Sequence, residues 1–502
     1  MPDSTRLVLA LSTLTEVAAA LREIDDLVAE SRSPFDALVW DFLAAGPSPA
    51  SAFDFETRIA EAARELGRRV VEHFYNRLEL EAATRPPKIR VDGEEYRRLN
   101  EKTPRRHVAT LLGTITLWRH GYRPSHRESA ESTVFPLEES LGLVEGATPA
   151  LAEAAGRYLA EGGSSQRTAL DRLKSHHGVC WGAERLRRVT AELARSMASV
   201  RHELQVGRVI DLLRQADVSL GSTKPVLGVG RDGITLRESR CRFFEVAAVG
   251  TVTVYDRAGK RLGTVYLAAV PEPNQPAMNR HLTELIEGVL KAWGGPLPRL
   301  AYVTDAGITE TAYYRRVLRP MRHPRTRAKL DWRRVVDFYH AAQRLWDMAS
   351  ALFGKDERAG ADWARRMAKL LKKPNGPSRV LHSAAQWKAR RTLPETREKE
   401  YRTAYEYIRE RSRFMRYAEY ARVKIPLGSG VTEAACKTVV AQRLKLSGMR
   451  WTKAGAEVIL DLRVMLLSGL WTKAYRRILN VRSDCEFRTP ERADREPMGI
   501  AL

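Results

Sequence analysis

Three acidic residues lie where the sequence predicts that a strand ends or a helix begins. Asp232 and Asp305 each end a strand-like run, and Glu433 lies near the start of a helical segment. Carboxylates that converge at strand ends can hold two divalent cations, and hard oxygen ligands suit Mg²⁺ or Mn²⁺. Two such ions, roughly 3.5–4 Å apart, stabilise the attacking and the leaving oxygen when a phosphodiester is displaced. The acids therefore indicate metal-dependent phosphodiester chemistry, although each alone also fits a turn or a cap.

The elements that must position these acids follow a regular order. Between residues 225 and 353, strand-like runs rich in Val, Ile and Thr give way to segments with apolar residues every three or four positions. The resulting order is β-β-β-α-β-α-β-α. This order predicts an α/β fold with a mixed sheet and helices on both of its faces.

The third acid is far from the other two in the sequence. From Asp305 to Glu433 the gap is 128 residues, too long for one loop, so an all-α insertion over 355–425 is expected. The Gly-Ser-Gly run at 428–430 then predicts a break and N-cap, which places Glu433 in the first turns of a last long helix, near its positive dipole end. The alternative is a solvated ion pair of Glu433 with Lys437.

The rest of the chain divides by its patterning. Residues 89–143 predict a small strand pair, and residues 164–194 predict a capped helix, a turn at Gly178 and a second helix. That outline fits a helix-turn-helix or an ordinary helical pair. The whole division is a helical region (1–88), a small β-hairpin domain (89–143), helix-turn-helix-like DNA-binding helices (144–220), a catalytic core in two parts (221–354 and 426–480) around the insertion (355–425), and a mobile tail (481–502).

The amino-acid composition limits the kind of partner that the chain is expected to bind. The chain has 502 residues with 84 Lys and Arg against 61 Asp and Glu, a net charge of +23. That excess favours a polyanion, and nucleic acid fits better than a ribosome or an anionic membrane because the cations are spread over folded segments. The four cysteines lie far apart, so neither a zinc site nor a disulfide framework is expected. With no signal peptide or membrane span evident, we expect a cytoplasmic protein.

Two basic segments are candidate DNA surfaces, because arginine and lysine bind phosphates. The alternatives are a solvated helix face and, for Trp451, a place in the core. The first segment, at 315–334, has a single acid, and the second interleaves cations with an aromatic residue. The candidates are Arg315, Arg316, Arg319, Arg322, Arg325, Arg327, Arg333 and Arg334 in the first, and Arg443, Lys445, Arg450 and Trp451 in the second.

The sequence segments around the acids resemble those of a known family. They are GRDGITLR at Asp232, YVTDAG at Asp305, VVDFYHAAQRL with Asp337 and His340, and GSGVTEAACKTVVAQRLKLSGMRW at Glu433. Together they resemble the DDE transposases of the bacterial insertion-sequence ISKra-type group, and more distantly the Mutator-like transposases. The last segment is long and specific, and the resemblance covers roughly residues 90–470.

The resemblance implies an RNase H-like catalytic domain, split by a helical insertion, that cleaves and joins DNA at element ends. It makes Asp232, Asp305 and Glu433 the ligands of Mg²⁺, for which Mn²⁺ substitutes, and it places His340 beside the catalytic sheet. There His340 would contact the scissile phosphate or orient a carboxylate, or else hold a strand to its helix. Relatives often carry a cysteine-rich zinc site in the small β-domain. The cysteines are absent here, so no zinc is expected.

The expected function is therefore Mg²⁺-dependent cleavage at transposon ends and strand transfer into target DNA, by a bacterial, nucleoid-associated protein. The family implies a homodimer or higher oligomer when two double-stranded ends are synapsed. Two alternatives remain, a catalytically inactive transposase-derived DNA-binding protein and an RNase H-like structure-specific nuclease that cuts without joining.

Overall fold

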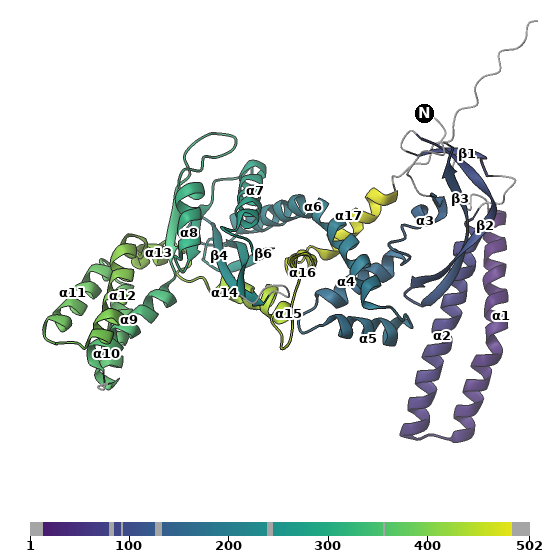
Figure 1. Cartoon of the computed structure of the whole chain (residues 1–502), viewed down its shortest axis with the longest axis horizontal. Helices are drawn as coiled ribbons and strands as arrows, with labels where there is room; N and C mark the ends of the chain where they lie inside the picture. Colours follow the sequence, from purple (N-terminus) through teal and green to yellow (C-terminus); the bar gives the residue numbers. More distant parts are fainter. Residues whose placement is uncertain are drawn as a thin grey trace, which may run out of the picture. The chain divides into compact units, whose positions relative to one another are not determined.

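The computed structural model describes residues 14–79, 85–91, 94–125, 133–237, 244–354 and 357–483 (Figure 1). The chain forms two compact units. The first comprises Met1–Leu159, Ser164–Leu193 and Tyr475–Leu502, and the second comprises Ala160–Gly163 and Ala194–Ala474. Apart from its first three residues, the tail predicted at 481–502 lies outside the described residues. No helix in the described part of the chain is long and apolar enough to cross a membrane.

The first unit is helical with one small sheet. A break at Gly46, where φ is +71°, separates α1 from α2. The small sheet has three antiparallel strands, not the predicted two, because a short strand adds to the outer edge of a long hairpin. The elements are α1 (Leu14–Ala45), α2 (Pro49–Arg77), β1 (Lys88–Val91), β2 (Glu94–Thr110), β3 (Gly113–Pro124), α3 (Pro136–Ser140), α4 (Pro149–Ala160) and α5 (Gln166–His177), with α17 (Trp471–Ser483) from Tyr475 onward.

The predicted helix, turn and second helix are present. Ser165 caps α5, since its hydroxyl accepts a hydrogen bond of 3.0 Å from the Thr168 amide. Gly178 ends the helix in the left-handed region at φ +64°. The second helix, α6 (Ala183–Asp217), runs for 35 residues and continues into the second unit. A DNA-binding role for these helices stays a prediction.

The second unit is built on a mixed five-stranded sheet in the order β6-β5-β4-β7-β8. Its three parallel strands are β4, β7 and β8, while β5 and β6 pair antiparallel. The mixed α/β fold predicted from the element order is thus confirmed. The strands are β4 (Val226–Arg237), β5 (Phe244–Tyr255), β6 (Arg261–Ala269), β7 (Arg299–Thr304) and β8 (Trp332–Val336).

Helices cover both faces of this sheet. Alternate residues of one strand enter different cores: Leu300 and Tyr302 pack with α6 and α7, whereas Ala301 and Val303 pack with α9 and the helices after it. Burial on both faces explains why β7 is apolar without alternation. The helices that follow the strands are α7 (Pro276–Ala292), α8 (Ile308–Tyr313), the π-helix η1 (Tyr314–Leu318) and α9 (Phe338–Phe353).

The segment predicted as an all-α insertion is helical where it is described. Figure 1 shows its helices gathered around α9, and one apolar core joins them to that helix. Its elements are α10 (Glu357–Leu371), α11 (Gly376–Ala389), α12 (Glu395–Arg411), the 3-10 turn η2 (Ser412–Phe414) and α13 (Tyr417–Arg422).

The long helix predicted after residue 428 is present in part: one continuous helical run spans residues 430–444, but its middle is a π-helix and it ends at a turn before residue 453. The chain forms α14 (Gly430–Ala435), the π-helix η3 (Cys436–Ala441), α15 (Gln442–Leu444) and, after a turn, α16 (Lys453–Leu467). The buried Arg463 explains why the π-turn is stable, because its Nε donates a 2.8 Å hydrogen bond to the Val439 carbonyl and Nη2 donates to the Thr438 carbonyl. These carbonyls therefore do not depend on regular α-helical partners.

Candidate active site

Asp232 lies within β4, not at its end. Pairing of β4 with β7 stops at Gly230, but pairing with β5 continues to Arg237. The side chain therefore stands just beyond the parallel part of the sheet, at the edge where β7 and β8 end. The prediction of a strand end was wrong for β4 as a whole, because the antiparallel neighbour extends the strand by several residues.

Asp305 follows β7 directly, as predicted. Its Oδ1 accepts a 3.0 Å hydrogen bond from the Gly307 amide, and its carbonyl accepts one of 2.7 Å from the Tyr407 hydroxyl of α12. The next residue, Ala306, is buried and has φ +63°, a conformation that side chains other than glycine seldom adopt. Backbone strain of this kind concentrates at functional sites.

Glu433 is in the first turn of α14, as predicted, and a glycine lets this helix approach the sheet. A Cβ built on Gly230 would lie 1.9 Å from Thr432 Oγ1. The Thr432 hydroxyl is hydrogen-bonded to that of Thr251, at 2.8 Å, on the neighbouring strand β5. The absence of a side chain at Gly230 therefore sets how closely α14 packs against β4.

The predicted acids influence one another electrostatically. Burial raises the pKa of Asp232, and the negative charges of Asp305 and Glu433 raise it further, although the Gly233 amide lowers it through a hydrogen bond of 2.7 Å. The Cys436 thiol donates to Asp232 Oδ2 at 3.5 Å. Burial and the two nearby carboxylates raise the pKa of this thiol well above its ordinary value, which keeps it protonated.

A second group of residues connects β8 and α9 to α14. Asp337 is fully buried, and its Oδ1 accepts a 2.8 Å hydrogen bond from the His340 amide, which caps α9. Its Oδ2 accepts from the Ser429 amide and, at 2.8 Å, from the Ser429 hydroxyl. That hydroxyl oxygen is also 2.8 Å from Glu433 Oε1. One hydroxyl proton serves one carboxylate at a time, so Ser429 links the two acids directly.

His340 lies between the same acids. Its Nδ1 is 3.4 Å from Asp337 Oδ1 and 3.7 Å from Glu433 Oε1. The contact with Asp337 raises the pKa of His340, and the charges of Glu433 and Asp305 add to this. The pKa of Asp337 is about 2: burial raises it, but hydrogen bonds from His340 and Ser429 outweigh that effect. The carboxylate of Asp337, which the fold holds in place, thus stabilises the protonated imidazole of His340.

The ligand geometry differs from the predicted one. Among the described residues, only Asp337, His340 and Glu433 offer three ligand atoms that all lie within 4.8 Å of one another. Asp232 and Asp305 join Glu433 through charge interactions, but the three do not form so tight a group. The family resemblance singled out Asp337 and His340, but the serine that joins them to Glu433 was missed.

Glu310 is a further acid that sequence reasoning missed. It is in the first turn of α8, five residues after Asp305, and only 9% of it is exposed. Burial raises its pKa, the Asp305 charge adds to the increase, and the cation of Arg231 opposes it. Its helical position after a strand-end aspartate was the available signal.

The comparisons with known proteins leave the site to be judged on its geometry. No protein-family model matches the chain. A search of curated proteins likewise finds no match.

The first predicted DNA surface is exposed, with one exception. The prediction that Arg334 belongs to an exposed DNA surface was wrong. This residue is 4% exposed, donates a 2.6 Å hydrogen bond to Thr311 and stacks on the rings of Tyr314 and Phe414. Successive residues of β8 face opposite sides of the sheet, and Arg334 lies on the side where Tyr314 and Phe414 cover it, whereas the adjacent Arg333 is exposed. The remaining members are exposed: Arg315, Arg316, Arg319, Arg322, Arg325, Arg327 and Arg333.

The second predicted surface loses its first member. Arg443 is fully buried and stacks on Trp451, and burial together with the cation of Arg463 lowers its pKa to about 10. It is a structural residue in this fold, not a contact for DNA. Trp451 is half-buried and donates a 2.9 Å hydrogen bond to the Leu444 carbonyl. Lys445 and Arg450 are exposed.

Proposed function

We propose that this chain is a DDE transposase whose second unit is an RNase H-like catalytic core. The observation that carries the proposal is the convergence of Asp232, Asp305 and Glu433, from β4, the end of β7 and α14, with charges that act on one another. The strand order supports it, because an RNase H-like sheet is a mixed five-stranded sheet with this arrangement of parallel and antiparallel neighbours.

The donor set fits a hard divalent cation. Its atoms are carboxylate oxygens. Burial is the main cause of the raised pKa of Asp232, the charges of Asp305 and Glu433 add to it, and a bound cation would relieve that repulsion. Asp232, Asp305 and Glu433 would hold Mg²⁺ or Mn²⁺, with Asp337 and His340 beside them. When bound, such ions supply charge stabilisation for the oxygens that enter and leave the phosphate.

The chain's own residues then have distinct tasks. Asp337 fixes the ring of His340, so that its Nδ1 proton points to the carboxylates. Ser429 orients Glu433 through the 2.8 Å contact. His340 is half-exposed, which leaves its ring accessible to a phosphate of the substrate. The exposed arginines from Arg315 to Arg333 bind the backbone of double-stranded DNA, and their number predicts strong salt dependence.

The test is a cleavage and joining assay with Mg²⁺ or Mn²⁺ and DNA that carries the ends flanking the gene. Wild type is compared with Asp232→Ala, Glu433→Ala and, as the control, Asp362→Ala, an exposed acid of α10 paired with Arg365 at 3.0 Å. We expect both site variants to lose at least about 1,000-fold in cleavage and to keep DNA binding, because they remove transition-state charge stabilisation. The control is expected to stay within about twofold of wild type.

Other outcomes separate the alternatives. Binding of both ends without metal-dependent cutting would overturn the proposal in favour of a transposase-derived DNA-binding protein. Cutting without strand-transfer products would favour a structure-specific nuclease. Assembly on paired ends, measured by light scattering, tests the proposed homodimer or higher oligomer, and imaging of the tagged protein in bacteria tests the proposed nucleoid association.

A further inference from the structure

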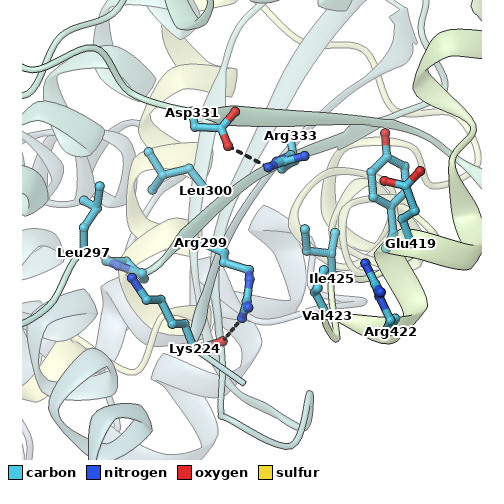
Figure 2. A pocket seen from close by; sticks show the side chains of 12 residues that line it. Lys224, Leu297, Arg299, Leu300, Asp331, Arg333, Glu419, Arg422, Val423 and Ile425 are labelled. Carbon is cyan, nitrogen blue, oxygen red and sulfur yellow. Dashed lines mark hydrogen bonds and ion pairs between the residues drawn. The ribbon is translucent and has the colours of Figure 1, made fainter. Parts of the chain in front are cut away.

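A second concave site lies at the other end of the parallel strands. Figure 2 shows this pocket at the amino ends of β7 and β8, whereas Asp305 and Asp337 follow the carboxyl ends of the same strands. Its volume is about 520 Å³, a size typical of small-ligand sites. Asp305 is six positions after Arg299 and directly follows β7, so the pocket and the acids are roughly 20 Å apart.

The lining of the pocket carries more cationic than anionic side chains. It is lined by Lys224, Arg299, Arg333 and Arg422, against two carboxylates. Both acids are already paired: Asp331 with Arg333 at 2.8 Å, and Glu419 with Arg416, outside the pocket lining, also at 2.8 Å. Among the described residues, three of the four cations therefore have no carboxylate paired with them.

Two of these cations are available to a ligand. Lys224 and Arg422 are exposed, and within the described ranges neither side chain makes a hydrogen bond or an ion pair. Arg299 is partly committed, since it donates a 3.1 Å hydrogen bond to the Lys224 carbonyl, drawn as a dashed line in Figure 2. Like charges that converge without a counter-charge repel one another, which a bound anion would relieve.

The same pocket has an apolar wall. Leu297 and Leu300 come from the start of β7 and the loop before it, and Val423 and Ile425 follow α13. Leu297 is 40% exposed although it is a large aliphatic residue. A site with cations beside an exposed apolar surface suits a ligand that carries a phosphate and a flat, weakly polar group.

We propose that this pocket binds a nucleotide unit, with its phosphate between Lys224 and Arg422 and its base against Leu297 and Val423. The unit is either a free nucleotide or a nucleotide of a nucleic-acid strand, since both present the same phosphate and base. The site is separate from the carboxylates, so its occupancy does not depend on the transposase chemistry proposed above.

The test is equilibrium binding to the full chain. Deoxyadenosine monophosphate is titrated by calorimetry, and a fluorescein-labelled ten-nucleotide single strand is titrated by anisotropy. The variants are Lys224→Ala, Arg422→Ala and both together, with Arg402→Ala, an exposed cation of α12 outside the pocket, as the control. Because neither side chain makes a hydrogen bond or an ion pair within the described ranges, the variants are expected to keep the wild-type melting temperature.

We expect each single variant to weaken binding about tenfold and the double variant about 100-fold, as for a lost charge-assisted hydrogen bond, and the control to stay within about twofold. Loss for the mononucleotide identifies a free nucleotide as the ligand. Loss for the labelled strand alone identifies a nucleotide within a nucleic acid. The proposal is overturned if the double variant binds both probes as wild type does, or if neither probe binds wild type. Asp232→Asn in the same titrations is expected to change neither affinity, and a loss there would place the ligand at the carboxylates.

Discussion

The two ends of the parallel strands carry opposite charges and hold them in different ways. At the carboxyl end, Asp337 is fully buried and accepts hydrogen bonds from two backbone amides and a hydroxyl. At the amino end, Lys224 and Arg422 extend from exposed positions, and in the described part of the chain neither side chain makes a hydrogen bond or an ion pair. The acids are thus fixed by the fold, whereas the cations are free to adjust.

This difference indicates two kinds of site. Fixed carboxylates suit chemistry, because charge stabilisation depends on groups that need no reorganisation during the reaction. Long exposed cations suit binding, since they adapt to a phosphate without defining one geometry. Substitutions at each end test whether the fold holds the acids of the carboxyl end in place and leaves the cations of the amino end free to move.

The largest effect is expected from truncation of Asp337. Asp337→Ala leaves buried amides and the Ser429 hydroxyl without their acceptor, so we expect a loss of about 3 kcal/mol in the free energy of unfolding. Arg422→Ala, at the opposite end, is expected to change it by less than about 0.5 kcal/mol. Urea denaturation at pH 7 measures both. Equal losses would contradict the contrast between fixed and free charges.

The low pKa of Asp337 adds a pH dependence. It is about 2 in the folded chain against an ordinary 3.8, so its contribution is present above about pH 4 and is lost as the pH falls toward 2. The lost stability is on the order of 2 kcal/mol. The difference between wild type and Asp337→Asn in urea denaturation is therefore expected to shrink across that range.

A smaller effect is expected from Gly230→Ala. The new Cβ would meet Thr432 Oγ1 at 1.9 Å, so α14 must move, at an expected cost of about 2 kcal/mol in the free energy of unfolding. Cleavage is expected to fall as well, because α14 carries Glu433. Gly207→Ala is the matched control: nothing lies within 4 Å of its Cβ, and it is inside α6. It is expected to stabilise the chain by about 0.5–1 kcal/mol. A similar result for both variants in thermal unfolding would refute close packing at Gly230.

The smallest effect is a change in one titration. The pKa of His340 is expected to lie above 6.5, and Glu433→Gln is expected to lower it, because one of the charges that raises it is removed. The stabilising contribution of the imidazolium is complete below pH 6.5 and is lost as the pH rises through the higher folded value.

Proton NMR of the imidazole measures this change. Lys224→Ala is expected to leave the pKa of His340 unchanged. The two ends of the parallel strands lie roughly 20 Å apart, which exceeds the screening length of about 8 Å at physiological salt. A shift in that variant would show that the two ends are coupled.

Much of the second unit could be predicted from the sequence. The order of strands and helices follows from apolar periodicity, and the positions of Asp305 and Glu433 follow from the ends of their elements. Asp337 and His340 were singled out by the resemblance alone, and only the structure shows that Asp337 caps α9 at a strand-to-helix junction.

Other features could not be read from local patterns. Arg334 and Arg443 belong to basic segments, and charge alone predicted an exposed surface for them. Their burial depends on aromatic rings at Tyr314, Phe414 and Trp451, to which they are stacked. Likewise, the π-turn after α14 is supported by Arg463, which follows it by more than 20 residues.

The sequence by itself determined most of the strands and helices of the second unit, that Asp305 follows a strand and that Glu433 begins a helix, because periodicity and turn chemistry act over a few residues. Only the tertiary structure decided which charges are buried, that Ser429 joins Asp337 to Glu433, and that cations gather at the amino ends of β7 and β8. These features depend on segments distant in the chain, since Ser429 is 92 residues from Asp337. The physical reason is that burial and electrostatic coupling are set by distance in space, which local sequence does not specify.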